Sequence, residues 1–203
     1  MFSDYKKNSL NSVKNLKIVG IVHLATCYGK QRQTKKYIYN VNCNTPIKIL
    51  NILSNKYLKY YINTDTYYSE KIKFNDSRDH YVKSKKNFLK FLKLNFQKLR
   101  IINLKIFHMY GPNDRKDKFL PIIINKLKKN KKIDLTSGNQ ILDFVHVNDV
   151  CRAYYLILKN ILNNRKLENS YEIGTSEGIK LKNVLIMLNK KIKNNVFLNF
   201  NKI

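Results

Sequence analysis

Two hydrophobic periods alternate along this chain, and that alternation constrains its fold more than any other feature. Continuous apolar runs of strand length, rich in Ile, Val and Tyr, occur at residues 16–25, 57–63 and 100–110. Apolar residues recur at helical spacing at 38–55 and 80–96. Strands that are apolar on both faces and alternate with helices are typical of a parallel sheet covered by helices.

The C-terminal part continues the alternation. Residues 118–130 read as a helix in which Pro121 is tolerated only in the first turn, and 131–147 as two short strands around a turn at 137–139. We expect a helix over 148–164 with Asn148 as its N-cap, and a strand, a Gly-containing turn and a helix over 170–188. The fold class expected is α/β, a parallel sheet with helices on both faces.

Ligands of such sheets bind at the carboxyl ends of the strands. Here those ends fall near Ala25 and Thr26, near Thr64, and near Tyr110 and Gly111.

Length and composition limit the class of protein. A chain of 203 residues with 43% hydrophobic residues is one domain, or one and a fraction, with a real core. It has no apolar run of the ~18–20 residues that span a bilayer and no signal-peptide pattern at its start, so a cytoplasmic location is expected. The three cysteines are widely spaced, without C-x-x-C, which favours reduced thiols and predicts no metal site.

The formal net charge of +27 has two readings. It could mark a nucleic-acid or anionic-membrane partner. Lysines are, however, scattered along the chain, and Arg, the usual reader of bases and phosphates, is scarce. Compositional drift toward Lys, Asn, Ile and Tyr is favoured, so a nucleic-acid partner is not expected and a basic nucleic-acid-binding protein remains only an alternative.

The most chemically suggestive pair is Tyr81 and Lys85, four residues apart in a predicted helix. Residues i and i+4 lie on one helix face, so the ammonium can approach the phenol and lower its pKa from ~10. Such a Tyr can exchange a proton with a substrate hydroxyl or carbonyl. Thr64, at a neighbouring strand end, could hold the same substrate oxygen. In a chain this rich in Tyr and Lys, the spacing alone also arises by chance.

Seven segments, in order, resemble the extended short-chain dehydrogenase/reductase family, the NAD-dependent epimerases and dehydratases of nucleotide sugars. They are GIVHLATCYG (20–29), VNCNT (41–45), NTDTYY (63–68), YVKSK (81–85), IFHMYGPNDRKDKFLPIIINKL (106–127), GNQILDFVHVNDVCRAY (138–154) and YEIGTSEGIKL (171–181). HLATCYG together with HMYGP most resembles the CDP-abequose synthase branch, which reduces a 4-keto group on a CDP-linked deoxysugar for surface polysaccharide.

The resemblance implies a role for several residues. Tyr81 would be the acid/base, and Lys85 would lower its pKa and hold the nicotinamide ribose of NAD or NADP. Thr64 would bind the reacting oxygen, with Asp65 beside it as a substrate contact. The cofactor would be lined by Ala25 and Thr26, and the substrate faced by His108. Each keeps a plainer alternative: Thr64 could simply end its strand, His108 could be a packed histidine, and Asn42 a polar helix residue.

The subclass follows from a missing carboxylate. The 4,6-dehydratases of the family carry Asp-Glu after the catalytic Thr, whereas Thr64 is followed by Asp65 and Thr66. Without that Glu there is no obvious base for the sugar C5 proton. The resemblance therefore implies 4-keto reduction or 4-epimerisation of a nucleotide-linked deoxyhexose, in lipopolysaccharide biosynthesis.

The departures predict a truncated form. None of the six glycines is spaced as in the family's G-x-x-G-x-x-G fingerprint, whose backbone binds the cofactor pyrophosphate. Leu142 replaces the Arg that grips the nucleotide diphosphate, and His146 and Asn148 replace a Tyr and an Asp.

We therefore expect a truncated Rossmann-like sheet, with a partial dinucleotide-binding domain at 1–110 and a small partial substrate-binding portion at 111–203 interleaved with it. NAD(P)H binding would be weak. The chain could work with a separate N-terminal half or as a homodimer, or be an inactive fragment.

Overall fold

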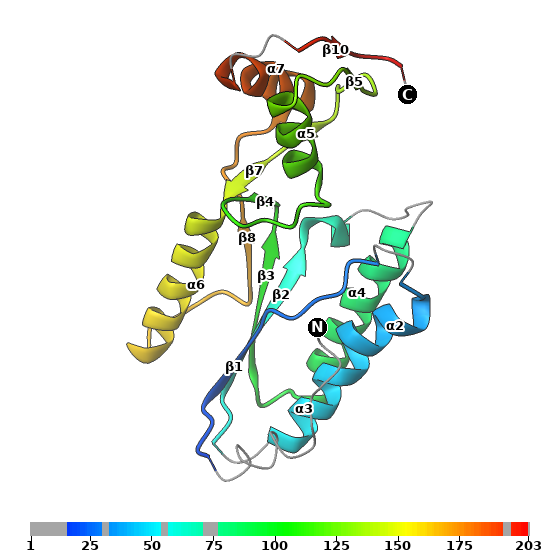
Figure 1. Ribbon diagram of the computed structural model, residues 1–203. Coiled ribbons are helices and arrows are strands. Elements are labelled where there is room, and N and C mark those ends of the chain that lie inside the picture. Colours follow the sequence, from blue (N-terminus) through cyan, green and yellow to red (C-terminus); the bar gives the residue numbers. More distant parts are fainter. Residues whose placement is uncertain (1–15, 30–32, 54–56, 71–76, 193–195, 203) are drawn as a thin grey trace. The chain divides into compact units, whose positions relative to one another are not determined.

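The computed structural model describes residues 16–29, 33–53, 57–70, 77–192 and 196–202 (Figure 1). The chain divides into two compact units. The first comprises residues up to Ile106 together with Leu167–Glu172, and the second comprises Phe107–Lys166 and Ile173–Ile203. The domain division expected at residue 110 concerned the roles of the two parts, and those roles stay predictions.

A four-stranded sheet is the framework of the first unit. Its order is β1 (Gly20–His23), β2 (Tyr60–Thr66), β3 (Arg100–Ile106) and β8 (Ser170–Ile173). β1 and β2 are parallel, and so are β2 and β3, whose register runs from Tyr60 opposite Arg100 to Thr66 opposite Ile106. Parallel neighbours end at the same edge of the sheet, so the carboxyl ends of β1, β2 and β3 lie together (Figure 1).

Helices cover one face of this sheet. α2 (Lys35–Tyr39) runs through a π-helical turn (Asn40–Asn44) into α3 (Thr45–Leu53), and α4 (Ser77–Asn95) follows β2 after a short 3-10 turn (Tyr67–Glu70). The apolar cluster beneath them draws on the π turn, α3, α4, β2 and the segment before β3: Cys43, Leu50, Tyr61, Phe88, Leu92 and Leu99. Burial of this cluster fixes α4 against β2.

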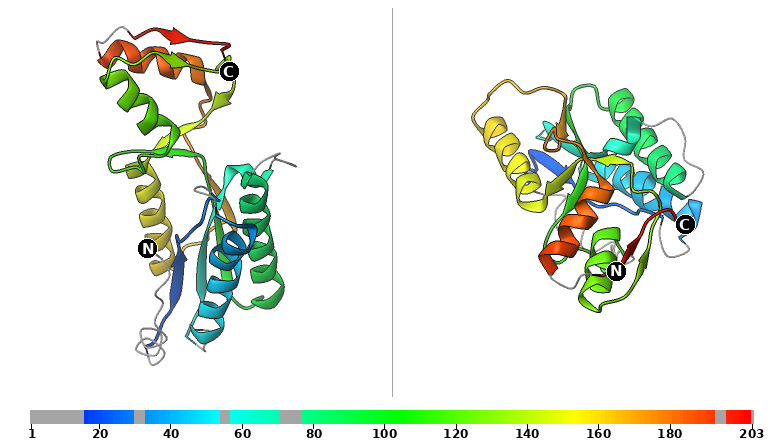
Figure 2. Two further views of the ribbon diagram at one scale, coloured as in Figure 1. Left: turned by 45° about the vertical axis from the view of Figure 1, so that its right-hand side comes forward. Right: turned by 90° about the horizontal axis from the view of Figure 1, so that it is seen from above.

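The second unit is built from short strands and three helices. β4 (His108–Tyr110) pairs in parallel with β7 (Phe144–His146), and β6 (Ile141–Leu142) pairs antiparallel with β9 (Ile179–Lys180). β5 (Ile133–Asp134) pairs with β10 (Leu198–Asn199). The helices are α5 (Phe119–Lys128), α6 (Val147–Leu162) and α7 (Leu181–Ile192), and α5 and α7 enclose an apolar core with Ile133 and Leu135 (Figure 2).

The predicted α/β class and parallel sheet are confirmed, with three local corrections. The single helix expected at 38–55 is broken by the π turn, and the strand expected at 100–110 divides into β3 and β4. Asn148 is not the N-cap of α6. His146 holds that position, and its Nδ1 accepts a hydrogen bond from the Asn148 backbone N–H. Pro121 lies in the first turn of α5, as its missing N–H requires.

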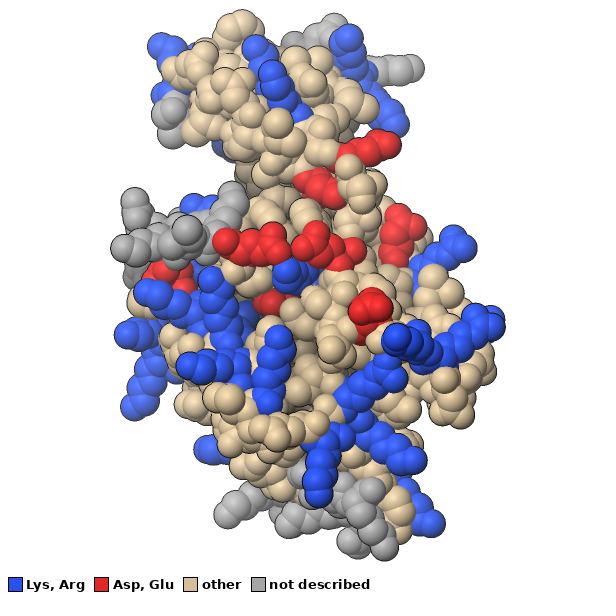
Figure 3. Space-filling model, turned by 180° about the vertical axis from the view of Figure 1, so that it is seen from behind, with Lys and Arg blue, Asp and Glu red and all other residues tan. Residues whose placement is uncertain are grey.

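Two surface properties bear on the expected partners. Among the residues described, no helix is both long and apolar enough to cross a membrane. Figure 3 shows Lys and Arg side chains spread over both units on the visible face, instead of collected in one basic stripe.

Candidate active site

Six of the seven predicted site residues lie near the carboxyl ends of β1 and β2 in the first unit, or on the helix that follows β2. Ala25 and Thr26 follow one residue after the end of β1, and Thr64 and Asp65 are among the last three residues of β2. The helix α4 then carries the predicted Tyr81 and Lys85. The parallel sheet brings these ends to one edge, and the packing of α4 on β2 brings Lys85 to it.

Lys85 reaches the end of β2. Its Nζ donates a hydrogen bond to the Thr64 carbonyl oxygen at 2.9 Å, and the side chain is almost completely buried. Burial lowers the pKa of the Lys85 ammonium to about 8, and the Asp65 carboxylate acts in the opposite direction. A cation is thus held at the end of β2.

Tyr81 is buried beside the same strand ends. Only 6% of the residue is exposed, and its ring lies 5.3 Å from the ring of Tyr28. Burial raises the pKa of Tyr81 above its ordinary value, while hydrogen bonds from Thr66 and Thr26 act to lower it. The expected fall in the pKa of this phenol is therefore not found, because desolvation of the phenolate outweighs the hydrogen bonds.

A buried asparagine joins the β1 loop to α4. The Asn42 side chain, in the π turn, accepts from the Cys27 backbone N–H at 2.7 Å and donates to the Cys27 carbonyl at 2.8 Å. It also donates to Ser84 Oγ at 2.9 Å, and Ser84 in turn donates to the Tyr81 carbonyl at 2.7 Å. π turns are frequent at functional sites. Here the side-chain amide of Asn42 bonds both the loop that carries Thr26 and the helix that carries the Tyr81 phenol.

Asp65 lies in a polar network on β2 and β3. Its carboxylate accepts from the Thr66 backbone N–H at 2.8 Å and from Asn103 Nδ2 at 3.1 Å, and only 5% of the residue is exposed. Asn63 donates to Asn103 Oδ1 at 2.7 Å. These are contacts within the fold, and the substrate contact expected for Asp65 stays a prediction.

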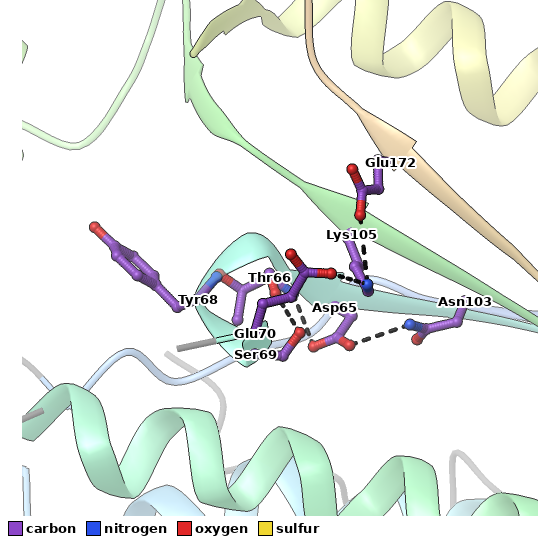
Figure 4. Close-up of polar contacts among 8 residues, drawn as sticks. All are labelled: Asp65, Thr66, Tyr68, Ser69, Glu70, Asn103, Lys105 and Glu172. Atoms are coloured by element: carbon purple, nitrogen blue, oxygen red, sulfur yellow. Dashed lines mark hydrogen bonds and ion pairs between the residues drawn. The ribbon is translucent and has the colours of Figure 1, made fainter. Parts of the chain in front are cut away.

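An ion-pair cluster borders that network. Lys105 of β3 pairs with Glu70 of the 3-10 turn and, at 3.5 Å, with Glu172 of β8 (Figure 4). Glu70, Lys105 and Asp65 line a groove of about 340 Å³ on the first unit, to which α4 contributes Lys86 and Lys93. Tyr68 points away from the cluster.

His108 belongs to the second unit. It lies on β4 with its ring 5.6 Å from that of Phe144, and its backbone N–H donates to the Asp143 carbonyl at 3.0 Å. Its predicted contact with substrate stays a prediction.

Sequence reasoning missed three contributors: Thr66, Ser84 and the bridging role of Asn42. A signal for each was present. Thr66 shares a strand face with Thr64, because side chains two apart point the same way. Ser84 is the Ser of YVKSK, and Asn42 the Asn of VNCNT.

Known proteins resemble this chain in sequence. The model of the "NAD dependent epimerase/dehydratase family" matches residues 5–174. CDP-abequose synthase of Salmonella muenchen is 31% identical over 92% of this chain and 64% of its own length. The protein of the same name from Salmonella typhimurium is 34% identical over 84% of this chain and 58% of its own length. The chain therefore spans less than two thirds of these curated relatives.

Solved structures share the fold. The Bordetella bronchiseptica enzyme WbmH, in complex with NAD+, superposes with a TM-score of 0.77 at 16% identity, over 96% of this chain and 65% of its own. UDP-glucuronic acid 4-epimerase from Bacillus cereus, also with NAD, gives 0.76 at 20% identity, over 94% of this chain and 63% of its own. The family match and the parallel sheet agree, and the chain belongs to the NAD-dependent epimerase/dehydratase family.

Proposed function

We propose that this chain carries the proton-transfer part of a nucleotide-sugar oxidoreductase site, for 4-keto reduction or 4-epimerisation of a nucleotide-linked deoxyhexose. One observation supports this above all: a buried phenol, Tyr81, hydrogen-bonded by Thr26 and Thr66 where β1 and β2 end, with the Lys85 cation at the same strand end. The similarity to CDP-abequose synthases supports a CDP-linked sugar.

The protonation state of Tyr81 favours reduction over epimerisation. With its pKa above the ordinary value, the phenol is protonated near neutral pH and is suited to donate to an oxygen that gains negative charge. Ketone reduction needs that donation at C4, whereas epimerisation begins with the removal of a proton from the C4 hydroxyl. Thr64 and Thr66 would hold the reacting oxygen, and Lys85 would stabilise its charge. Substrate contacts by Asp65 and His108 stay part of the proposal.

The cofactor proposed is NAD or NADP. When bound, its nicotinamide would exchange a hydride with the sugar C4. The polar groups of Thr26, Tyr81 and Lys85 at the strand ends fit a nicotinamide riboside, with Ala25 beside them. The six glycines of the chain do not form the Gly-rich loop that binds the cofactor pyrophosphate in this family. We therefore propose weak binding by this chain alone, and completion of the site by a separate N-terminal half or by a second copy.

Calorimetry tests the binding proposal. Titration of NADH and NADPH into the 203-residue chain should give dissociation constants far above the micromolar range, because the contacts to the pyrophosphate are missing. Micromolar affinity would contradict this proposal and leave the assignment of the proton donor intact.

Turnover at saturating cofactor tests the chemistry. With millimolar NAD(P)H and a CDP-linked 4-keto-6-deoxyhexose, the protein should form the 4-hydroxy sugar. Tyr81→Phe should lower the rate by about 10²-fold or more, because the proton donor is lost. Tyr155→Phe, which removes an exposed phenol on α6, is the matched control. Equal rates for the two variants would reject Tyr81 as the acid.

Three outcomes would redirect the assignment. Elimination of water from a nucleotide-hexose would overturn the preference against dehydration. No turnover with any CDP sugar, with NAD(P)H shown to bind, would favour an inactive fragment. Nucleic-acid binding that survives about 0.3 M salt would favour the basic binding protein. The cytoplasmic location and the role in lipopolysaccharide synthesis stay predictions.

A further inference from the structure

A buried carboxylate lies near the buried ammonium of the site. Asp65, on β2, is 5% exposed, and Lys85, on α4, is 2% exposed. The Lys85 ammonium is bonded to the carbonyl of Thr64, the residue directly before Asp65. The Asp65 carboxylate is itself fixed on both oxygens, by Thr66 N and by Asn103 Nδ2.

Burial of an isolated ammonium is costly, so its charge needs a partner. The groups that face Lys85 come from three elements. On β1, His23 is buried, and burial together with the Lys85 charge lowers its pKa to about 4, so it is neutral near pH 7. On α4 itself, Tyr81 is a neutral phenol. On β2, Asp65 supplies the opposite charge, and its attraction works against the loss of the Lys85 proton.

We propose that Asp65 is a positioning residue, whose carboxylate, anchored to Asn103 and to the Thr66 backbone, holds Lys85 as an ammonium ion against the end of β2. The proposal rests on the proposed function only for what that ammonium then does to a substrate or cofactor.

The test removes the negative charge of the side chain at position 65 and keeps its shape. In Asp65→Asn the new amide oxygen can still accept from the Thr66 N–H. The amide nitrogen can donate to Asn103 once the side-chain amides of Asn103 and Asn63 are flipped, so the hydrogen-bond chain is re-formed without the negative charge. The matched control is Asp79→Asn, which removes a carboxylate from α4 that pairs with Lys83 at 2.7 Å on the exposed side.

The readout is the titration of Lys85 itself. The protein is made with isotope-labelled lysine, and the Nζ and Cε resonances are followed by NMR from about pH 6 to about pH 11. The Lys85 signals are assigned by their absence in Lys85→Arg. In the wild type the midpoint should lie near pH 8. In Asp65→Asn it should fall to about pH 7 or below, and in Asp79→Asn it should not move.

Each outcome decides the question. A Lys85 midpoint that is the same in Asp65→Asn and in the wild type would overturn the proposal. If Asp65→Asn does not fold, the wild-type titration decides alone, because a midpoint below about pH 7 would mean that Asp65 does not keep Lys85 charged.

The readout needs no turnover. A shifted midpoint in a protein that neither binds NAD(P)H nor reduces a sugar would keep this inference and reject the proposed function. Sugar reduction by the protein, together with a Lys85 midpoint that is unchanged in Asp65→Asn, would reject this inference and keep the proposed function.

Discussion

Replacement of Asn42 by Ala should destabilise the first unit by about 3 kcal/mol. The Asn42 side chain is fully buried, and it is the partner of both backbone groups of Cys27, a residue only 6% exposed. Each buried polar group left without a partner costs about 1–3 kcal/mol, so the two groups together cost about 2–6 kcal/mol. Ser84 loses the hydrogen bond from Asn42 but keeps its own bond to the Tyr81 carbonyl, so it adds less to the loss of stability.

Urea unfolding followed by circular dichroism measures this loss. For a chain of this size the dependence on urea is about 2–3 kcal/mol per M, so the midpoint should fall by about 1 M. Asn44→Ala is the control, because Asn44 is exposed in the same π turn and its replacement brings the same gain in helix propensity. If the midpoints of the two variants agree within about 0.2 M, the Asn42 bridge does not stabilise the fold as argued.

Two further predictions concern close packing and pH. Gly174→Ala should lower the melting temperature of the protein far more than Gly20→Ala, because a methyl group at 174 overlaps the Asp143 carboxylate, whereas at 20 it makes only ordinary contacts; equal losses in differential scanning calorimetry would contradict this. His23 is buried as the neutral imidazole, with a folded pKa of about 4 against 6.5 for an exposed histidine. As pH falls, the unfolded chain therefore takes up the proton before the folded chain does. The free energy of unfolding present above pH 6.5 decreases by about 3 kcal/mol in total as pH falls to about 4. In His23→Leu the unfolding free energy should depend less on pH over this window; identical curves for wild type and His23→Leu would show that another group is responsible.

Local patterns were enough for much of the fold. The strand-like runs at 16–25 and 100–110 contain β1 and β3, the run at 57–63 covers the first four residues of β2, and the helical spacing at 80–96 matches α4 closely. These features depend on the period of apolar side chains along a short stretch, which the sequence displays directly. Segment boundaries were less accurate, because capping depends on contacts such as the one between His146 and Asn148.

What the sequence by itself determined was the family, the α/β order of elements, and the placement of Tyr81 and Lys85 on one helix face, since each follows from residue order and helical period. What only the tertiary structure decided was the environment of these groups. The Lys85 ammonium is bonded to the Thr64 carbonyl, Thr66 joins Thr26 at the phenol, and the pKa of Tyr81 rises instead of falling. Burial and hydrogen-bond partners are set by segments distant in the sequence, and a pKa depends on those surroundings more than on the residue four positions away.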